Sequence, residues 1–374
     1  MSRPKVLAAV VPAAKQMELR EFDWPEMGPR DMMVQVLACG VCGSDAHHFW
    51  EDAWHTRFPI IPGHEVICRV AEVGQAAATH HGVQMGDIVA VELIVPCWEC
   101  YWCKQQLFNL CVQDALEGRE YGCNIPITRP PGLWGGYAEY LYVPYEANVH
   151  KCPPDIHIMA GVFIEPLAVA VRAVNLAARR RVGDSAVIVG GGTIGIVQAI
   201  AAKTAGFDPV ILLGTRDSRL SLAAEIGCVD AAINVNKGDP VKAINGLTDG
   251  LGADVVFETA GSVSAQQQCF DYARKGGTVV LVGLTGNRII PINTDASIAT
   301  KELTLQASFL NAGGYPAAIK IIASGRFPIE KMATQTFPLK DAFEAMRVAR
   351  EEHDVSVKVV LIPSQDSRTT GGHG

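Results

Sequence analysis

The sequence carries no excess of basic charge. Its 32 lysines and arginines stand against 39 aspartates and glutamates, for a net charge of −7. Proteins that bind nucleic acid usually present a basic patch or stripe, so this balance argues against a nucleic-acid partner. Charged residues are also scarce overall, at 19%, whereas hydrophobic residues reach 49%. A chain of this composition can bury a large core, which argues against intrinsic disorder.

Long apolar runs are missing as well. The N-terminal residues, Met1 to Lys5, contain no apolar segment of the kind that a secretory signal needs. The longest stretch without a charged residue, 185–202, has 18 residues, but three consecutive glycines interrupt it. It divides better into a buried strand and a helix than into a membrane span. We therefore expect a cytoplasmic protein with no membrane partner.

The 374 residues suggest two domains, and the pattern of apolar, proline and glycine residues changes along the chain. Short alternating runs rich in proline and glycine fill the first part and return near the end, as in a small β domain. Between them, continuous apolar strands alternate with helices, which indicates a parallel sheet covered on both faces. The sequence predicts an α/β protein: a doubly wound parallel sheet inserted into a discontinuous β-rich domain. The expected boundaries are 1–165 for the β-rich domain with a small lobe at 95–113, 166–305 for the α/β domain, and 306–374 for the return and tail.

Four of the eleven cysteines lie within fifteen residues: Cys97, Cys100, Cys103 and Cys111. Four thiolates at this spacing can surround Zn²⁺ as a tetrahedron, which is typical of a structural site. A redox pair would need only two of them, and a nucleic-acid-binding zinc ribbon conflicts with the acidic net charge. The pattern therefore predicts a structural zinc ion.

A glycine-rich turn follows a short apolar strand at 186–189. Gly190, Gly192 and Gly195 fit the G-x-G-x-x-G pattern and open a helix, which is the context that dinucleotide binding requires. The pyrophosphate of the ligand would then lie on the helix N-terminus. The expected cofactor-binding residues of this turn are the three glycines together with Thr193 and Ile194. The alternative is an ordinary strand-to-helix turn.

A more dispersed set consists of Cys42, His64, Glu65 and Glu165. Mixed sulfur, nitrogen and oxygen ligands with one position left for water make a catalytic zinc site. Taken singly, Cys42 could form a dithiol with Cys39, His64 could be an ordinary hydrogen-bonded histidine, and Glu165 could be a carboxylate at a helix start. Spacing alone leaves the zinc site and these alternatives equally open.

Several motifs occur in an order that resembles a known family. They are Cys39-Gly40-Val41-Cys42-Gly43-Ser44-Asp45-Ala46-His47, Gly63-His64-Glu65, the four-cysteine lobe, Gly135-Gly136-Tyr137-Ala138-Glu139-Tyr140 and the glycine-rich turn. Together they resemble the zinc-dependent medium-chain dehydrogenases, which include alcohol, polyol and threonine dehydrogenases. The resemblance runs from about Lys5 to Ile362. It implies a GroES-like catalytic domain, a Rossmann domain, two zinc ions per chain and a homodimer or homotetramer. Ile164-Glu165-Pro166-Leu167 resembles the polyol and threonine branch, where glutamate replaces a cysteine ligand.

The resemblance also implies a reaction, in which a hydride moves between the carbon of a small alcohol or ketone and the nicotinamide. Ser44 matches the hydroxyl that takes the alcohol proton, His47 matches its exit to solvent, and Asp45 matches the carboxylate that orients His64. Ser44 could instead be a turn residue and His47 a surface histidine. A zinc-scaffolded regulatory protein that binds nicotinamide nucleotide without turnover is the alternative of another class. A zinc-free quinone or enoyl reductase does not account for the ligand set.

One segment and a set of aromatic residues bear on the substrate. The stretch 124–133 is longer than the link expected before the Gly135-Gly136 motif, and it could shape the substrate mouth or a subunit contact. Four aromatic residues, Phe49, Trp50, Trp54 and Trp134, suggest a bulky alcohol, although each could equally belong to the core.

The strand at 210–213 bears on cofactor choice. NAD-binding Rossmann domains place an acidic residue about 20 positions past the glycines, where it accepts hydrogen bonds from the ribose 2′-hydroxyl. Here that position is Gly214, and Thr215 and Arg216 follow. A glycine leaves room for a 2′-phosphate, and a guanidinium binds phosphate oxygens well. The sequence predicts a preference for NADP, with NAD possible. Asp217 is the counter-evidence, and an NAD-dependent polyol or amino-alcohol dehydrogenase is the alternative.

Overall fold

The computed structural model describes residues 5–51, 56–113, 118–177, 181–352 and 354–363. These residues form two compact units. Unit 1 comprises residues 1–165 and 333–374, and unit 2 comprises residues 166–332. The strand pairings of the described residues stay within one unit or the other: unit 1 has a seven-stranded sheet and a separate antiparallel pair of strands, β1 and β2, and unit 2 has a six-stranded sheet.

Unit 1 is built on a mixed, mostly antiparallel sheet with the strand order β14-β15-β3-β4-β5-β7, and β6 also pairs with β3. The long strands β3 and β4 carry alternating and continuous buried residues, as expected for the centre of a core. The strands are β1 (Val6–Val10), β2 (Glu18–Phe22), β3 (Met32–Gly40), β4 (Glu65–Val73), β5 (Ile88–Val91), β6 (Tyr140–Val143), β7 (Val149–Lys151), β14 (Ala333–Pro338) and β15 (Lys358–Ile362). The α-helices are α1 (Gly43–Glu51), α2 (Gln75–His81), α3 (Tyr101–Lys104), α5 (Ile158–Gly161) and α13 (Ala342–Glu351).

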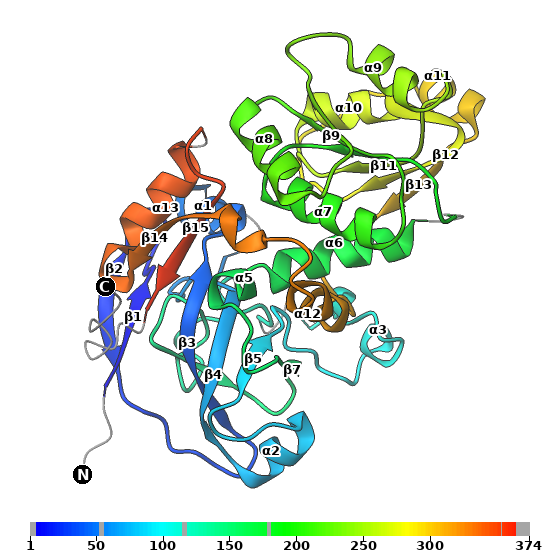
Figure 1. The fold of residues 1–374 in the computed structure, drawn as a ribbon. Coiled ribbons are helices and arrows are strands. Elements are labelled where there is room, and N and C mark those ends of the chain that lie inside the picture. Colours follow the sequence, from blue (N-terminus) through cyan, green and yellow to red (C-terminus); the bar gives the residue numbers. More distant parts are fainter. Residues whose placement is uncertain (1–4, 52–55, 114–117, 178–180, 353, 364–374) are drawn as a thin grey trace. The chain divides into compact units, whose positions relative to one another are not determined.

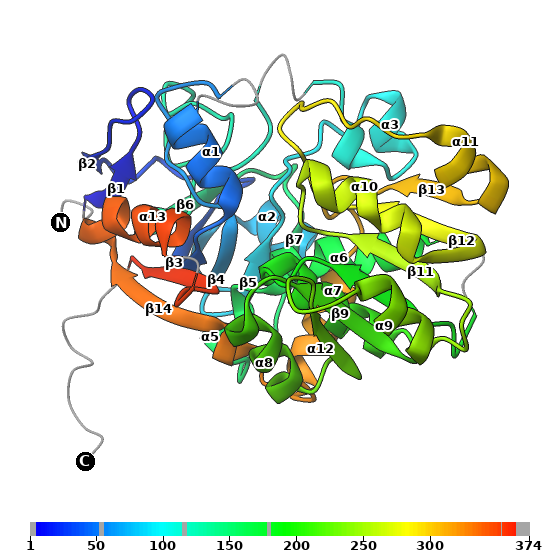
Figure 2. The same cartoon turned by 90° about the horizontal axis from the view of Figure 1, so that it is seen from above.

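Unit 2 contains a six-stranded parallel sheet with the order β10-β9-β8-β11-β12-β13. Its strands are β8 (Ala186–Val189), β9 (Val210–Gly214), β10 (Ala231–Asn234), β11 (Ala253–Glu258), β12 (Ala273–Leu281) and β13 (Thr304–Ala307). Its helices are α6 (Ile164–Leu176), which starts at the boundary, α7 (Thr193–Thr204), α8 (Asp217–Ile226), α9 (Pro240–Leu247), α10 (Val263–Tyr272), α11 (Thr294–Ser297) and α12 (Tyr315–Ala323). Helices α9 and α10 cover one face of the sheet, and α6 and α7 cover the other (Figures 1 and 2). This is the doubly wound arrangement that the alternating strands and helices predicted.

The second boundary between the units differs from the sequence-based expectation. Unit 2 extends to Met332 rather than to residue 305. The reason is that β13 adds the sixth strand to the parallel sheet, and the segment before α12 packs on α6. There, Arg172 donates a hydrogen bond to the Ala312 carbonyl at 3.3 Å, and a Cβ at Gly314 would overlap the Ala168 carbonyl.

The uncharged stretch 185–202 forms strand β8, the glycine turn and most of α7. The stretch is therefore apolar because its strand and most of its helix are buried within unit 2. No helix in the part of the chain that the structure describes combines the length and the apolar character that crossing a bilayer requires.

Candidate active site and cofactor pocket

The four cysteines of the lobe come together in space. One sulfur from each of Cys97, Cys100, Cys103 and Cys111 lies within 4.8 Å of all the others. Backbone N–H groups already point at two of these sulfurs, with Cys100 N at 3.3 Å from the Cys97 Sγ and Cys103 N at 3.5 Å from the Cys100 Sγ. The N–H of Cys103 is the main cause that lowers the pKa of Cys100 to about 6. The donor set and its closeness fit a tetrahedral zinc ion.

The second cluster forms where two neighbouring strands of unit 1 meet. Cys42 lies between the end of β3 and the start of α1, and His64 and Glu65 lie at the start of β4. Because β3 and β4 are antiparallel and pair Gly40 with Glu65, the end of one strand lies beside the start of the other. The ligand atoms of Cys42, His64 and Glu65 consequently lie within 4.8 Å of one another. A sulfur, a nitrogen and an oxygen donor fit a catalytic zinc ion.

The buried carboxylate of Asp45 lies next to the His64 ring. The Asp45 Oδ1 atom is 3.7 Å from the His64 Nδ1, which is an electrostatic contact rather than a hydrogen bond, and it has no hydrogen-bond partner among the described residues. The Asp45 Oδ2 atom accepts hydrogen bonds from the Cys42 N–H at 2.9 Å and from the Tyr137 hydroxyl at 3.1 Å. Burial raises the pKa of Asp45, and the His64 charge and these two donors oppose that shift. A carboxylate at Nδ1 leaves Nε2 of the ring as the nitrogen for a metal.

The glycine-rich motif before Tyr137 explains how that residue reaches Asp45. Gly136 N and Tyr137 N donate to the carbonyls of Gly63 and Pro62, so this segment runs directly against the residues that precede His64. A Cβ at Gly63 or at Gly136 would overlap the tightly packed side chains there, and the φ of Gly63 is +92°. Only glycine fits this close approach.

Glu65 is held by a buried lysine. The Lys358 Nζ atom lies 2.7 Å from Oε1 and 2.6 Å from Oε2 of Glu65, and both side chains are at most 5% exposed. Burial is the largest single influence on Lys358 and lowers its pKa, but the charges of Glu65, Cys42 and Glu165 and the hydrogen bond with Glu65 together raise the pKa overall. A Cβ at Gly40 would overlap the Glu65 carboxylate, so glycine is needed there too.

The remaining candidates of unit 1 are not members of this cluster. Glu165 is buried at the first turn of α6, but it is not within the cluster formed by Cys42, His64 and Glu65. Ser44 and His47 lie on α1, where Ser44 is half-buried and His47 is exposed. Cys123, which sequence reasoning did not single out, places its sulfur 3.7 Å from the His64 Nδ1.

The aromatic residues do not support a bulky substrate. Phe49 and Trp134 are 1% and 2% exposed and belong to the hydrophobic core of unit 1. Trp50 packs against that core, and Trp54 lies outside the described residues. The stretch 124–133 also folds back onto unit 1, because Ile127 N donates to the Pro59 carbonyl at 2.8 Å.

The glycine-rich turn of unit 2 has the geometry that the motif predicts. Gly190 has a φ of +121°, and a Cβ at Gly195 would overlap the Gly190 carbonyl oxygen. Gly192 is the N-cap of α7, so the turn leads directly into the helix N-terminus. A hollow of about 310 Å³ opens beside Gly190, Gly191 and Gly192. Thr193 and Ile194 form the first turn of α7 but do not line this hollow.

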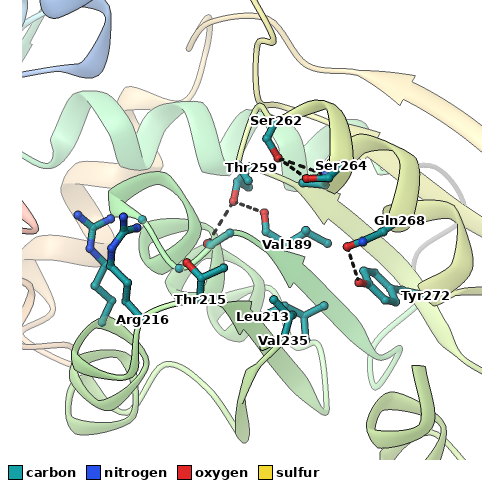
Figure 3. Close-up of a pocket in the computed structure, with 17 residues that line it drawn as sticks. Val189, Leu213, Thr215, Arg216, Val235, Thr259, Ser262, Ser264, Gln268 and Tyr272 are labelled. Atoms are coloured by element: carbon teal, nitrogen blue, oxygen red, sulfur yellow. Dashed lines mark hydrogen bonds between the residues drawn. The ribbon is translucent and has the colours of Figure 1, made fainter. Parts of the chain in front are cut away.

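The predicted cofactor-choice residues line the same hollow (Figure 3). Gly214, Thr215 and Arg216 lie on its wall, together with Arg219, which sequence reasoning did not count among the cofactor residues. A Cβ at Gly192 would lie 3.6 Å from the Arg219 Nη1 atom. In Figure 3, Thr215 and Arg216 are on the side away from Gln268 and Tyr272. The other walls come from Val235 and from the segment 259–272.

Asp217 does not line the hollow. Its Oδ1 atom accepts a hydrogen bond from Asn234 Nδ2 at 2.8 Å, and its Oδ2 atom lies 2.6 Å from the Lys237 Nζ. The pKa of Asp217 is lowered by its hydrogen bond with Lys237, so it is an ionised side chain that is already paired. Asp217, which comes three positions after Gly214, is thus turned toward β10.

Comparison with known proteins gives matches along most of the chain. Residues 28–154 match the profile of the alcohol dehydrogenase GroES-like domain, and residues 193–324 match that of the zinc-binding dehydrogenases. The chain is 36% identical to an erythritol/L-threitol dehydrogenase of Mycolicibacterium smegmatis, over 96% of this chain and 98% of the relative.

Two solved structures share the fold. One, described as a zinc-binding dehydrogenase from Sinorhizobium meliloti 1021 bound to NADP, is 30% identical with a TM-score of 0.85, covering 96% of this chain and all of that one. An alcohol dehydrogenase from Thermotoga maritima is 26% identical with a TM-score of 0.88, covering 97% of this chain and all of that one.

Proposed function

The chain belongs to the zinc-dependent medium-chain dehydrogenase/reductase family, and on that premise we propose that it is an NADP-preferring dehydrogenase of alcohols or polyols. Its alcohol or polyol dehydrogenase chemistry follows from the family. The observation that carries the cofactor proposal is the pairing of Asp217 with Asn234 and Lys237, which leaves Thr215 and Arg216 at the hollow.

The candidate site residues of unit 1 have distinct roles in the proposed reaction. Zinc held by Cys42, His64 and a carboxylate would supply Lewis acidity that polarises the substrate oxygen. Asp45, fixed by the Cys42 N–H and the Tyr137 hydroxyl, holds the imidazole of His64 in one orientation. Ser44 takes the proton of the alcohol, and the exposed His47 passes it to solvent. A nicotinamide cofactor bound at the hollow of unit 2 would supply the hydride acceptor for oxidation of the alcohol and the hydride donor for reduction of the ketone.

A polyol is the first substrate class to test. The named relatives include an erythritol/L-threitol dehydrogenase and a sorbitol dehydrogenase. Three of the four aromatic residues that favoured a bulky alcohol, Phe49, Trp50 and Trp134, lie in or against the core. A panel of four- to six-carbon polyols, simple secondary alcohols and aromatic alcohols, followed by the absorbance of the reduced cofactor, tests this class. Faster turnover of aromatic alcohols than of every polyol would contradict it.

The choice of cofactor should depend on Arg216. We expect the wild-type enzyme to prefer NADP over NAD by tenfold or more in kcat/KM, or about 1.4 kcal/mol. Arg216→Ala should lower kcat/KM for NADP by at least about tenfold, because a charge-assisted contact with the 2′-phosphate is lost. Activity with NAD, which lacks that phosphate, should stay within about twofold. Steady-state kinetics with both cofactors measure the effect.

Asp217→Asn is the matched control on the same loop. Because Asp217 is turned away from the hollow, its replacement should leave the NADP to NAD ratio unchanged. The proposal is wrong if the wild-type enzyme has the same kcat/KM with NAD as with NADP and Asp217→Asn abolishes activity with NAD. Asp217 would then be the residue that binds the ribose hydroxyl.

Metal analysis separates the proposed enzyme from a nicotinamide-binding regulatory protein. We expect about two zinc ions per chain, one for each ligand cluster. A value near one zinc ion, retained by Cys42→Ser and lost in a variant of the four-cysteine lobe, would favour the regulatory protein. Elemental analysis of the purified, extensively dialysed protein gives the number.

A further inference from the structure

Glu258 is a buried carboxylate at the carboxyl end of β11, and no role has been assigned to it so far. Its side chain is 0% exposed, and it does not line the cofactor hollow. Charged side chains are rarely buried this completely unless they make several hydrogen bonds. Burial raises the pKa of Glu258, and the backbone donors of Gly261 and Ala260 oppose that shift.

The carboxylate joins three segments of unit 2. The Oε1 atom accepts from Ala260 N at 2.8 Å and from Gly261 N at 3.0 Å, which ties down the loop after β11. The Oε2 atom accepts from the Gln266 Nε2 of α10 at 3.2 Å. The same Gln266 Nε2 donates to the Gly283 carbonyl at 2.8 Å, in the loop after β12.

The loop that Glu258 holds is a wall of the cofactor hollow. Thr259, Ala260 and Ser262 line it. The hydroxyl of Thr259 donates to the Val189 carbonyl at 2.9 Å, so the loop is also attached to the strand that leads into the glycine-rich turn (Figure 3). Gly261 has a φ of +62° and packs against the Leu284 backbone, which leaves the loop little room to move.

We propose that Glu258 is a positioning residue for the nicotinamide cofactor, which sets the width of the hollow by holding the 259–262 loop against the glycine-rich turn. Glu258 acts through Ala260 and Gly261 and never touches the cofactor itself. Preorganised walls raise affinity because the cofactor does not have to order them when it binds. The inference rests on nicotinamide cofactor binding and is independent of the choice between NADP and NAD.

Glu258→Gln tests the proposal with little change in shape. The single glutamine oxygen can accept hydrogen bonds from the N–H groups of Ala260 and Gly261 or from Gln266, but not from both sides. Its NH₂ group then faces another donor, the NH₂ group of Gln266, so the three segments are no longer joined. We expect the Kd of NADPH and of NADH, measured by fluorescence titration, to rise about tenfold. We expect kcat at saturating cofactor to stay within about threefold, because the cluster of Cys42, His64 and Glu65 is untouched.

Asp254→Asn is the matched control at the other end of the same strand. Asp254 also joins segments of unit 2, because it accepts from Ser185 N at 2.8 Å and from Arg274 Nε at 2.6 Å, but it lies outside the hollow. Its replacement should lower the melting temperature while leaving the Kd of both cofactors unchanged. A purely structural role for Glu258 would make the two variants behave alike.

The possible results are distinct. A Kd within twofold of wild type in Glu258→Gln overturns the inference. If that variant does not fold, Glu258→Asp shortens the side chain by one methylene and withdraws the carboxylate from the Ala260 and Gly261 N–H groups, and an unchanged Kd there overturns the inference as well. Failure of the wild-type protein to bind either reduced nucleotide would instead contradict the proposed function.

Discussion

Replacing Cys42 by serine should abolish nearly all turnover while the protein stays folded. Cys42 is half-buried and supplies the only sulfur to the cluster with His64 and Glu65 in the described residues. A serine hydroxyl is a poor zinc ligand at neutral pH, so the catalytic zinc should be lost while the four-cysteine lobe keeps its own. Loss of several kcal/mol of transition-state stabilisation corresponds to a fall in kcat of about 10³-fold or more. Paired measurements of zinc content and kcat test this.

Cys39→Ala is the matched control from the same segment. Cys39 is fully buried, and burial raises the pKa of its thiol well above the usual range, so it behaves as a small apolar side chain. We expect this variant to keep both zinc ions and a kcat within about threefold, with some loss of stability. Full activity in a Cys42→Ser protein of known zinc content would remove the proposed mechanism.

The features that could be predicted from the sequence are those whose residues are close along the chain. The four cysteines of the lobe span fifteen residues, and the glycine-rich turn lies between a strand and a helix that are both clear in the pattern. The geometry of each motif explains why it needs its residue types; for example, Gly195 lies so close to the Gly190 carbonyl that a side chain would not fit there. Local spacing therefore predicts them well.

The supports of the active site could not be predicted in this way. Lys358 and Glu65 are 293 positions apart, and Tyr137 and Asp45 are 92 positions apart. A lysine at the start of a strand looks like a solvated charge, and only the pairing of β15 with β3 shows that it is buried next to Glu65. Such contacts depend on the topology of the sheet, which periodicity does not encode.

The two edge strands of unit 2, β10 and β13, are difficult to recognise from the sequence for a related reason. Strand β10, Ala231–Asn234, is short and half-exposed at the edge of its sheet, so it gives no apolar run. Strand β13 alternates between half-buried and exposed residues, and the texture there suggested a return to the first domain. The pairing of β13 with β12 moves the boundary to residue 332.

The lobe at 95–113 buries few large apolar side chains besides Val95 and Phe108, and this determines what its metal does. Tyr101 is 68% exposed and Val112 is 55% exposed, and Leu110 also faces solvent. Its helical structure is limited to the single turn of α3 and the 3₁₀ turn at Phe108–Leu110. Hydrophobic burial therefore contributes little to the stability of the lobe, and the free energy of metal binding has to supply most of it.

Cys100→Ser should consequently give an insoluble protein, or one whose melting temperature falls by at least about 10 °C. Structural zinc contributes about 10–16 kcal/mol in isolated zinc-finger peptides, which is as large as the whole free energy of unfolding of a typical domain. The matched control is Cys228→Ser, because Cys228 is a buried cysteine outside the lobe and its thiol donates to the Ala223 carbonyl, as a serine hydroxyl can. Thermal denaturation and zinc analysis of both variants measure the difference. A soluble Cys100→Ser protein as stable as wild type would show that the four sulfurs are close together without needing a metal.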